Sequence, residues 1–151
     1  MKKSLVYVAV ATLLTGAAVT ATAGTVDGQG AQKRSLDAVT TDVDEQCEES
    51  GSADAATGDG FGFVILNAPG KSGATSRVLG EVALKKAEPK QTFAVFLAQD
   101  GACVAAGTLT TNGQGNGNAH IDQPALGGTY YVVLQDLDNS ERYASSPVLL
   151  R

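Results

Sequence analysis

His120, the only histidine in the chain, limits the acid–base chemistry that the sequence can support. A serine hydrolase would need a nucleophile on a G-x-S-x-G turn beside it, and the sequence has no such turn. Catalytic zinc and copper sites need several imidazole or thiolate ligands at once, more than this composition supplies. We therefore expect His120 to be a solvated residue. The alternative is a small hydrolase or metal-dependent enzyme that uses His120 with Asp122 or Asp136.

A second candidate for chemistry is the segment QDLDNSE, in which Asp136, Asp138 and Ser140 occupy alternate positions. This spacing resembles the first oxygen ligands of a calcium loop. The glycine expected at the sixth position is Glu141, however, and the bidentate glutamate expected at the twelfth is Pro147. The segment is better explained as a polar turn, with a weak extracellular calcium contact as the alternative.

The glycine-rich segments do not form a nucleotide site. Gly70, Lys71 and Ser72 resemble the end of a phosphate-binding loop, but Ile65 stands where that loop begins with glycine, and no helix is expected to follow. No pair of carboxylates is marked out for glycoside hydrolysis either. The sequence therefore predicts neither a cofactor nor a catalytic constellation.

The N-terminus has the features of a secretory signal peptide. Lys2 and Lys3 precede an apolar stretch at 5–14, and Ala21 and Ala23 form an A-x-A cleavage site. A membrane anchor is the alternative, but the apolar stretch is shorter than the roughly 20 residues that span a bilayer. We expect residues 1–23 to be removed and the mature chain to be secreted or held at the cell surface, without insertion into the membrane.

The two cysteines, Cys47 and Cys103, are an even count in a compartment where disulfides persist. We expect them to pair. Free or intermolecular thiols are the alternative, since Cys47 lies in a stretch that the composition marks as flexible.

Residues 24–60 differ in composition from the rest of the mature chain. They include nine acidic residues against Lys33 and Arg34, no aromatic residue, and many glycines, serines, alanines and threonines. Such a segment buries too little apolar surface to offset the entropy cost of ordering, so we expect an acidic flexible linker. The chain has a net charge of −5, and loss of Lys2 and Lys3 makes it more acidic, which disfavours nucleic acid as a partner.

The remaining residues, 61–151, predict one all-β domain. Apolar residues recur at every second position, and glycine, proline, asparagine and aspartate divide the segments. Pro147 should place the last strand at an edge or at a bulge. We expect a seven-stranded antiparallel immunoglobulin-like β-sandwich, with a small closed barrel as the competitor. The expected strands lie near 61–65, 77–85, 93–97, 102–110, 118–123, 129–135 and 142–150.

Two polar connections are the candidate binding loops of this domain. In TTNGQGNGN, Asn112 and Gly113 tolerate positive φ and predict a hairpin between the strands on either side. The second connection is the 136–142 turn. The candidate contact residues are Asn112, Gln114, Asn116, Asn118, Asp136 and Asp138.

The run GTLTTNGQGNGNAHIDQPALGGTYYVVL, with the preceding TFAVFLAQDGAC, resembles a pattern of small exported microbial proteins. These have a TTNxxGNGN-type immunoglobulin-like β-sandwich domain and no assigned activity. The resemblance covers about 60 residues and rests on glycine, asparagine and aromatic positions. It implies export and the sandwich fold, and it transfers no catalytic residue.

The sequence therefore favours a non-enzymatic exported module with a structural or binding role. Its expected partner is a macromolecule of the cell envelope or the medium. Besides the enzyme that uses His120, the remaining alternative is a carrier that holds a small ligand between the two sheets.

Overall fold

The computed structural model describes residues 30–40, Val43, Cys47, 60–68, 77–99, 102–124, 128–138 and 141–150. The predicted signal peptide and most of the predicted linker lie outside these residues. The elements whose bounds the structure describes are all β-strands, and every ladder between them is antiparallel. No helix within it is long and apolar enough to span a membrane. The strands are β1 (Gln32–Ala38), β2 (Gly62–Asn67), β3 (Arg77–Leu84), β4 (Thr92–Gln99), β5 (Ala102–Thr110), β6 (Gly117–Pro124), β7 (Gly128–Asp136), β8 (Arg142–Ser145) and β9 (Val148–Leu150).

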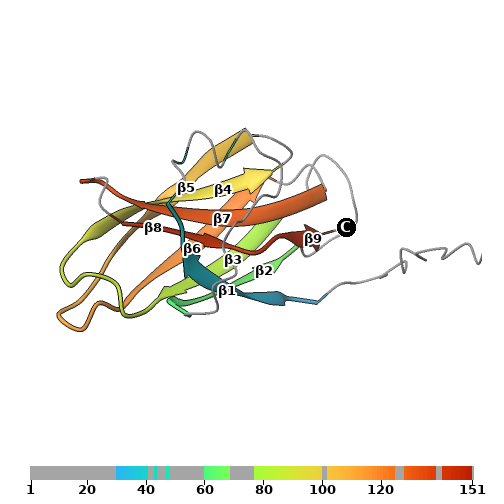
Figure 1. Ribbon diagram of the computed structural model, residues 1–151. Coiled ribbons are helices and arrows are strands. Elements are labelled where there is room, and N and C mark those ends of the chain that lie inside the picture. Colours follow the sequence, from blue (N-terminus) through green and yellow to red (C-terminus); the bar gives the residue numbers. More distant parts are fainter. Residues whose placement is uncertain are drawn as a thin grey trace, which may run out of the picture.

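The strands form one path of ladders in the order β5-β4-β7-β8-β1-β2-β3-β6, with β9 paired to the start of β7. We call β6, β3, β2 and the first half of β1 sheet A, and β5, β4, β7, β8 and the second half of β1 sheet B (Figure 1). The ends of the path also meet, because β5 contacts β6 and the Gln123 amide donates to the Ala105 carbonyl oxygen at 3.3 Å. The resulting all-β structure is nearly barrel-shaped.

Strand β1 corrects the prediction that residues 24–60 form a linker. Residues 32–35 pair with β2 and residues 36–38 pair with β8, so this strand joins the two sheets. Leu36 is fully buried in the core. The folded domain therefore includes residues before Phe61, where the sequence placed its start.

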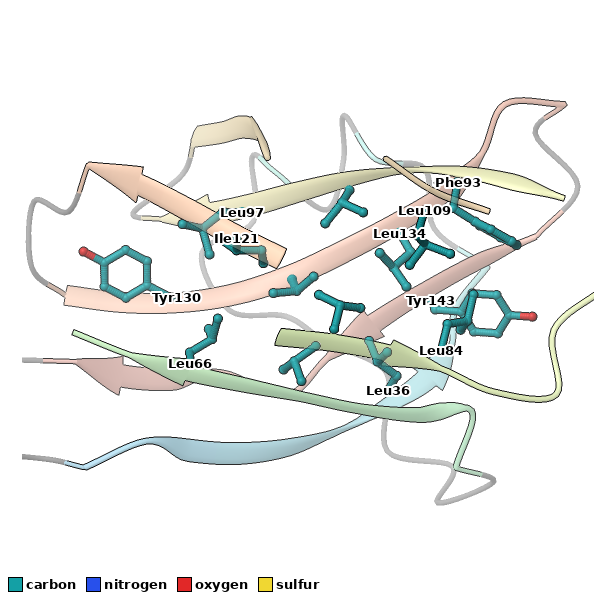
Figure 2. Close-up of a cluster of buried hydrophobic side chains, with 14 of the residues drawn as sticks. Leu36, Leu66, Leu84, Phe93, Leu97, Leu109, Ile121, Tyr130, Leu134 and Tyr143 are labelled. Atoms are coloured by element: carbon teal, nitrogen blue, oxygen red, sulfur yellow. The ribbon is translucent and has the colours of Figure 1, made fainter. Parts of the chain in front are cut away.

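The core fills the space between the sheets (Figure 2). Alternation works as predicted in β3, where Val78, Val82 and Leu84 are buried. Aromatic rings close one end of this core, since the Tyr143 ring lies 4.9 Å from Phe61 and 5.8 Å from Phe93 between centroids. The largest fully buried side chains are Tyr130, Phe93, Leu36, Leu66, Leu84, Leu97, Ile121, Leu134 and Leu150.

The outer face of sheet B carries a second apolar cluster. Val43 and Cys47 pack there against β4 and β7, with Tyr131 and Val133 buried beneath them. The predicted disulfide is confirmed, because Cys47 is bonded to Cys103 on β5 with a Cα–Cα distance of 5.3 Å. The bond ties the chain that follows β1 to the strand at the far side of sheet B.

The number of strands differs from the prediction, because the described residues form nine strands and not seven. One additional strand is β1. The other arises because the predicted strand 142–150 is interrupted at Ser146 and Pro147, which separates β8 from β9. Proline has no amide hydrogen to donate to a ladder, and the sequence had placed an edge or a bulge at this point.

The predicted hairpin after Asn112 is also wrong. Strand β5 pairs with β4 and β6 pairs with β3, so the connection between β5 and β6 passes from sheet B to sheet A. Neither Asn112 nor Gly113 has positive φ; the left-handed residue of this loop is Gly115, with φ of 75°. The Asn-Gly signal located the turn but not its conformation.

Candidate functional site

Both predicted binding segments lie at one end of the molecule, together with the turn that follows β3 (Figure 1). We call this the three-loop end: turn 85–91, loop 111–116, and the described residues Leu137, Asp138 and Glu141. Turn 85–91 lies between the other two, because the Ala87 amide donates to the Gly115 carbonyl oxygen at 3.1 Å and the Glu88 amide donates to Glu141 Oε2 at 3.1 Å. Residues distant in sequence therefore form one continuous surface.

Thr111 fixes loop 111–116 to turn 85–91. Its side chain is buried, and the hydroxyl donates to the Glu88 carbonyl oxygen at 2.7 Å and accepts from the Gln91 amide at 2.9 Å. Its own amide donates to the Gln91 carbonyl oxygen at 2.9 Å. Because this buried hydroxyl both donates and accepts a hydrogen bond, it fixes the distance between loop 111–116 and turn 85–91.

Asn112 shapes the loop from within. Its side-chain oxygen accepts from the amides of Gln114 at 2.9 Å and Asn116 at 3.1 Å. Its own amide donates to the Asn116 carbonyl oxygen at 2.8 Å. This is the local side-chain-to-backbone bonding that asparagine commonly provides in turns. The Asn112 oxygen is therefore engaged in the loop, whereas the sequence had assigned the residue to ligand contact.

Gly115 allows the two segments to approach closely. Its φ of 75° lies in the left-handed region, and a Cβ at this position would overlap the Ala87 carbonyl group. Turn 85–91 has two left-handed residues that are not glycine, Lys86 with φ of 60° and Lys90 with φ of 63°. Such residues are uncommon and persist where surrounding contacts fix the backbone.

The other predicted contact residues differ in position. Gln114 and Asn116 are exposed at the tip of loop 111–116, and Asp138 is exposed beside Leu137, which is 62% exposed. Asn118 is exposed but lies in β6, opposite Ala83 on sheet A.

Asp136 does not fit the prediction that it contacts a ligand, because it is only 1% exposed. Its Oδ1 accepts from the Asp138 amide at 3.1 Å, which places the carboxylate within the turn. A buried carboxylate that accepts a main-chain hydrogen bond in this way positions the backbone of the turn.

The three-loop end is acidic where it meets the core. Burial raises the pKa of Tyr143, and the carboxylates of Glu141, Asp136 and Glu88 raise it further. Tyr143 therefore remains a neutral hydrogen-bonding group beneath the loops at alkaline pH.

His120 lies on the outer face of sheet A, where its Nδ1 is 2.8 Å from Glu81 Oε1. Both side chains are largely exposed, at 59% and 63%. Asp122 pairs with Arg77, and this hydrogen bond holds the pKa of Asp122 below its ordinary value. The structure thus brings His120 to Glu81, which the sequence did not select.

Asp136, the other carboxylate suggested for His120, is on β7 in sheet B. No group of three or more histidines, cysteines or acidic residues that could hold a metal ion occurs within the described ranges. Ser140, the third residue of the calcium-like spacing, lies outside them.

Sequence reasoning missed Thr111, Lys86 and Lys90 as parts of the candidate site. Residues 86–92 were expected only to connect two strands, and their hydrogen bonds to Thr111 join positions about 20 residues apart. Nothing in the local pattern distinguishes Thr111, which is buried, from its exposed neighbour Thr110.

Comparisons with protein-family models, with curated proteins and with solved structures found no match to this chain.

Proposed function

We propose that the chain is an exported, non-enzymatic binding module that recognises a macromolecule of the cell envelope or the medium through the three-loop end. The observation that carries the proposal is the interlocking of the three segments by hydrogen bonds while their tips remain exposed. A surface that is ordered before binding loses less conformational entropy when it binds.

An immunoglobulin-like topology is part of this proposal. Strands β3 and β6 pair in sheet A, β4 and β7 pair in sheet B, and the β3–β4 and β6–β7 connections both pass between the sheets. In immunoglobulin variable domains, loops at one end of such an arrangement form the binding surface. The three-loop end contains the corresponding kind of connections, those that follow β3, β5 and β7.

Export is supported by the N-terminal pattern and is consistent with the Cys47–Cys103 disulfide. Disulfides persist in oxidising compartments and are rare in the cytosol. Cys47 also packs with Val43 on the outer face of sheet B, which is separate from the three-loop end.

The test is saturable binding of the labelled mature chain, residues 24–151, to envelopes and concentrated medium of the cells that produce it. The variant Gln114→Ala/Asn116→Ala removes exposed tip side chains but keeps the main-chain bonds of the loop. The matched control is Pro124→Ala, an exposed position at the other end of β6.

We expect the tip variant to bind about tenfold more weakly, since a loss of about 1.4 kcal/mol corresponds to that factor. The control should bind as the unmodified chain does. Equal binding by both variants, or no saturable binding of the unmodified chain to either fraction, would contradict the proposal.

A further inference from the structure

The outer face of sheet A carries a cluster of two lysines around one aromatic ring. Phe63 on β2 points outward, because its neighbours Val64 and Leu66 point into the core. Lys33 Nζ lies 3.9 Å from the centre of the Phe63 ring, and Lys85 Nζ lies 5.7 Å from it. Lys33 and Lys85 are exposed residues, while Phe63 is partly buried.

These two positive charges have no acidic partner among the described residues. The carboxylates on the same face are engaged elsewhere: Glu81 with His120, and Asp122 with Arg77. A cation over an aromatic ring gains only about 0.5–1 kcal/mol at an exposed site, and the ring neutralises no charge. Within the described part of the chain, the Lys33–Phe63–Lys85 cluster therefore holds two positive charges around one ring without an acidic partner.

The cluster lies on the face of a sheet and not at an edge. Phe63 pairs with Ser35 of β1 on one side and with Ala83 of β3 on the other. Since both ladders of β2 are occupied, an extended peptide cannot add here as a further strand, which is how peptides commonly bind to sheets. Recognition on this face must use side chains alone.

Apolar side chains continue the surface beside the ring. Ile65, Leu79 and Ala83 are partly exposed and alternate outward on β2 and β3. The face therefore combines an apolar strip with two ammonium groups. A chain of sugar rings with carboxylate groups matches both features, because its C–H faces pack on apolar surfaces and its carboxylates pair with ammonium groups.

We propose that the Lys33–Phe63–Lys85 cluster binds an acidic polysaccharide, with uronate carboxylates at the two lysines and a sugar ring against the apolar strip beside Phe63. Lys85 belongs both to this cluster and to turn 85–91, but the cluster lies on the outer face of sheet A and does not depend on the function proposed for the three-loop end. It would give the module a second contact, one with the polyanions of an extracellular matrix or envelope.

The probe is polygalacturonate, titrated into the full mature chain by isothermal calorimetry at low and at physiological salt. Lys33→Ala/Lys85→Ala should bind at least tenfold more weakly, and Phe63→Leu should lose a smaller factor. The matched control is Lys86→Asn/Lys90→Asn, which removes the same charge at exposed positions where asparagine tolerates left-handed φ. Circular dichroism of each variant verifies that it is folded.

Three further arms identify the ligand chemistry. Methyl-esterified polygalacturonate should not bind, because it lacks the carboxylates. Polyglutamate should bind more weakly than polygalacturonate, because it lacks the ring. Higher salt should weaken binding, because exposed charges are screened. The Gln114→Ala/Asn116→Ala variant should bind normally, which keeps this test distinct from that of the three-loop end.

The proposal is overturned if the unmodified chain does not bind polygalacturonate. It is also overturned if the Lys86→Asn/Lys90→Asn control loses as much affinity as Lys33→Ala/Lys85→Ala. Equal affinity for polyglutamate would overturn it too, because binding would then reflect charge alone.

Discussion

Single polar side chains determine the conformation of the three-loop end. Asn112 accepts two main-chain hydrogen bonds within its own loop, and Thr111 joins that loop to turn 85–91. Each bond contributes only about 0.5–1.5 kcal/mol net, but a buried or enclosed group left without a partner costs more than that contribution. The conformation of the exposed tips thus depends on side chains that do not themselves face a partner.

Asn112→Ala should lower the free energy of unfolding by about 1–2 kcal/mol, because the amides of Gln114 and Asn116 lose their acceptor. Urea denaturation of the mature chain measures this loss. Gln114→Ala, which removes an exposed side chain from the same loop, should stay within about 0.5 kcal/mol. Equal effects of the two substitutions would show that the Asn112 side chain does not organise the loop.

Tyr143 should make the fold sensitive to alkaline pH. An unfolded tyrosine loses its proton near pH 10, whereas burial and the neighbouring carboxylates raise the pKa of Tyr143 in the folded chain. The unfolded state therefore binds fewer protons above that pH, and stability should fall by up to about 1.4 kcal/mol per pH unit. Tyr143→Phe should make this dependence shallower in denaturation measured from pH 9 to pH 11. Parallel curves for the two proteins would refute the assignment.

At the scale of elements, β1 shows that a segment with the composition of a linker can contain a strand. The acidic, glycine-rich stretch at 24–60 has the average properties of a linker, yet seven of its residues form the strand that joins the two sheets. Its partners β2 and β8 lie far along the chain, and only Leu36 enters the apolar core. A strand stabilised by such distant pairing leaves almost no local signal in the sequence.

Leu36→Ala tests whether β1 belongs to the folded domain. Removing a fully buried leucine should cost about 2–5 kcal/mol, measured by chemical denaturation. Lys33→Ala, three residues earlier on the outer face, should cost no more than about 1 kcal/mol. If residues 24–60 were a linker, neither substitution would change stability.

Gly115 and Gly113 provide a matched pair within one loop. Gly115→Ala should destabilise the protein by at least about 2 kcal/mol, because it combines left-handed φ with overlap on the Ala87 carbonyl group. Gly113→Ala should change stability little, since nothing lies within 4 Å of its added Cβ. Thermal unfolding of both variants measures the difference, and equal melting temperatures would contradict the close contact between the two segments.

At the scale of the whole molecule, the sequence predicted where the strands lie better than it predicted which strands pair with each other. A strand was found at each position where apolar residues alternate, from β2 to β9. At Pro147 the sequence predicted an edge or a bulge within one strand, and the structure instead has two strands, β8 and β9. The connection after β5 was predicted as a hairpin because Asn-Gly favours one, but the partners of β5 and β6 are in different sheets. Alternation reports which side of a strand is buried, and it does not identify the neighbouring strand.

The same limit applied to the candidate site. The predicted contact residues Gln114, Asn116 and Asp138 are exposed in loops or turns, where polar residues beside glycine and aspartate are favoured. Their contact with a partner stays a prediction. That their two loops meet on turn 85–91 follows from the order of strands in the sheets. The composition of the two loops does not indicate that both contact turn 85–91.

Amide hydrogen exchange of the mature chain, resolved by residue, tests most directly whether the three-loop end is one ordered surface. The account predicts that the amides of Ala87, Lys90, Thr111 and Gly115 exchange as slowly as those of the strands they adjoin, because each donates to a main-chain carbonyl oxygen of this end. The amide of Gly113 serves as the internal reference for an unbonded loop position. Exchange of these four amides as fast as that of Gly113 would contradict the account, since loops that move independently present no preformed binding surface.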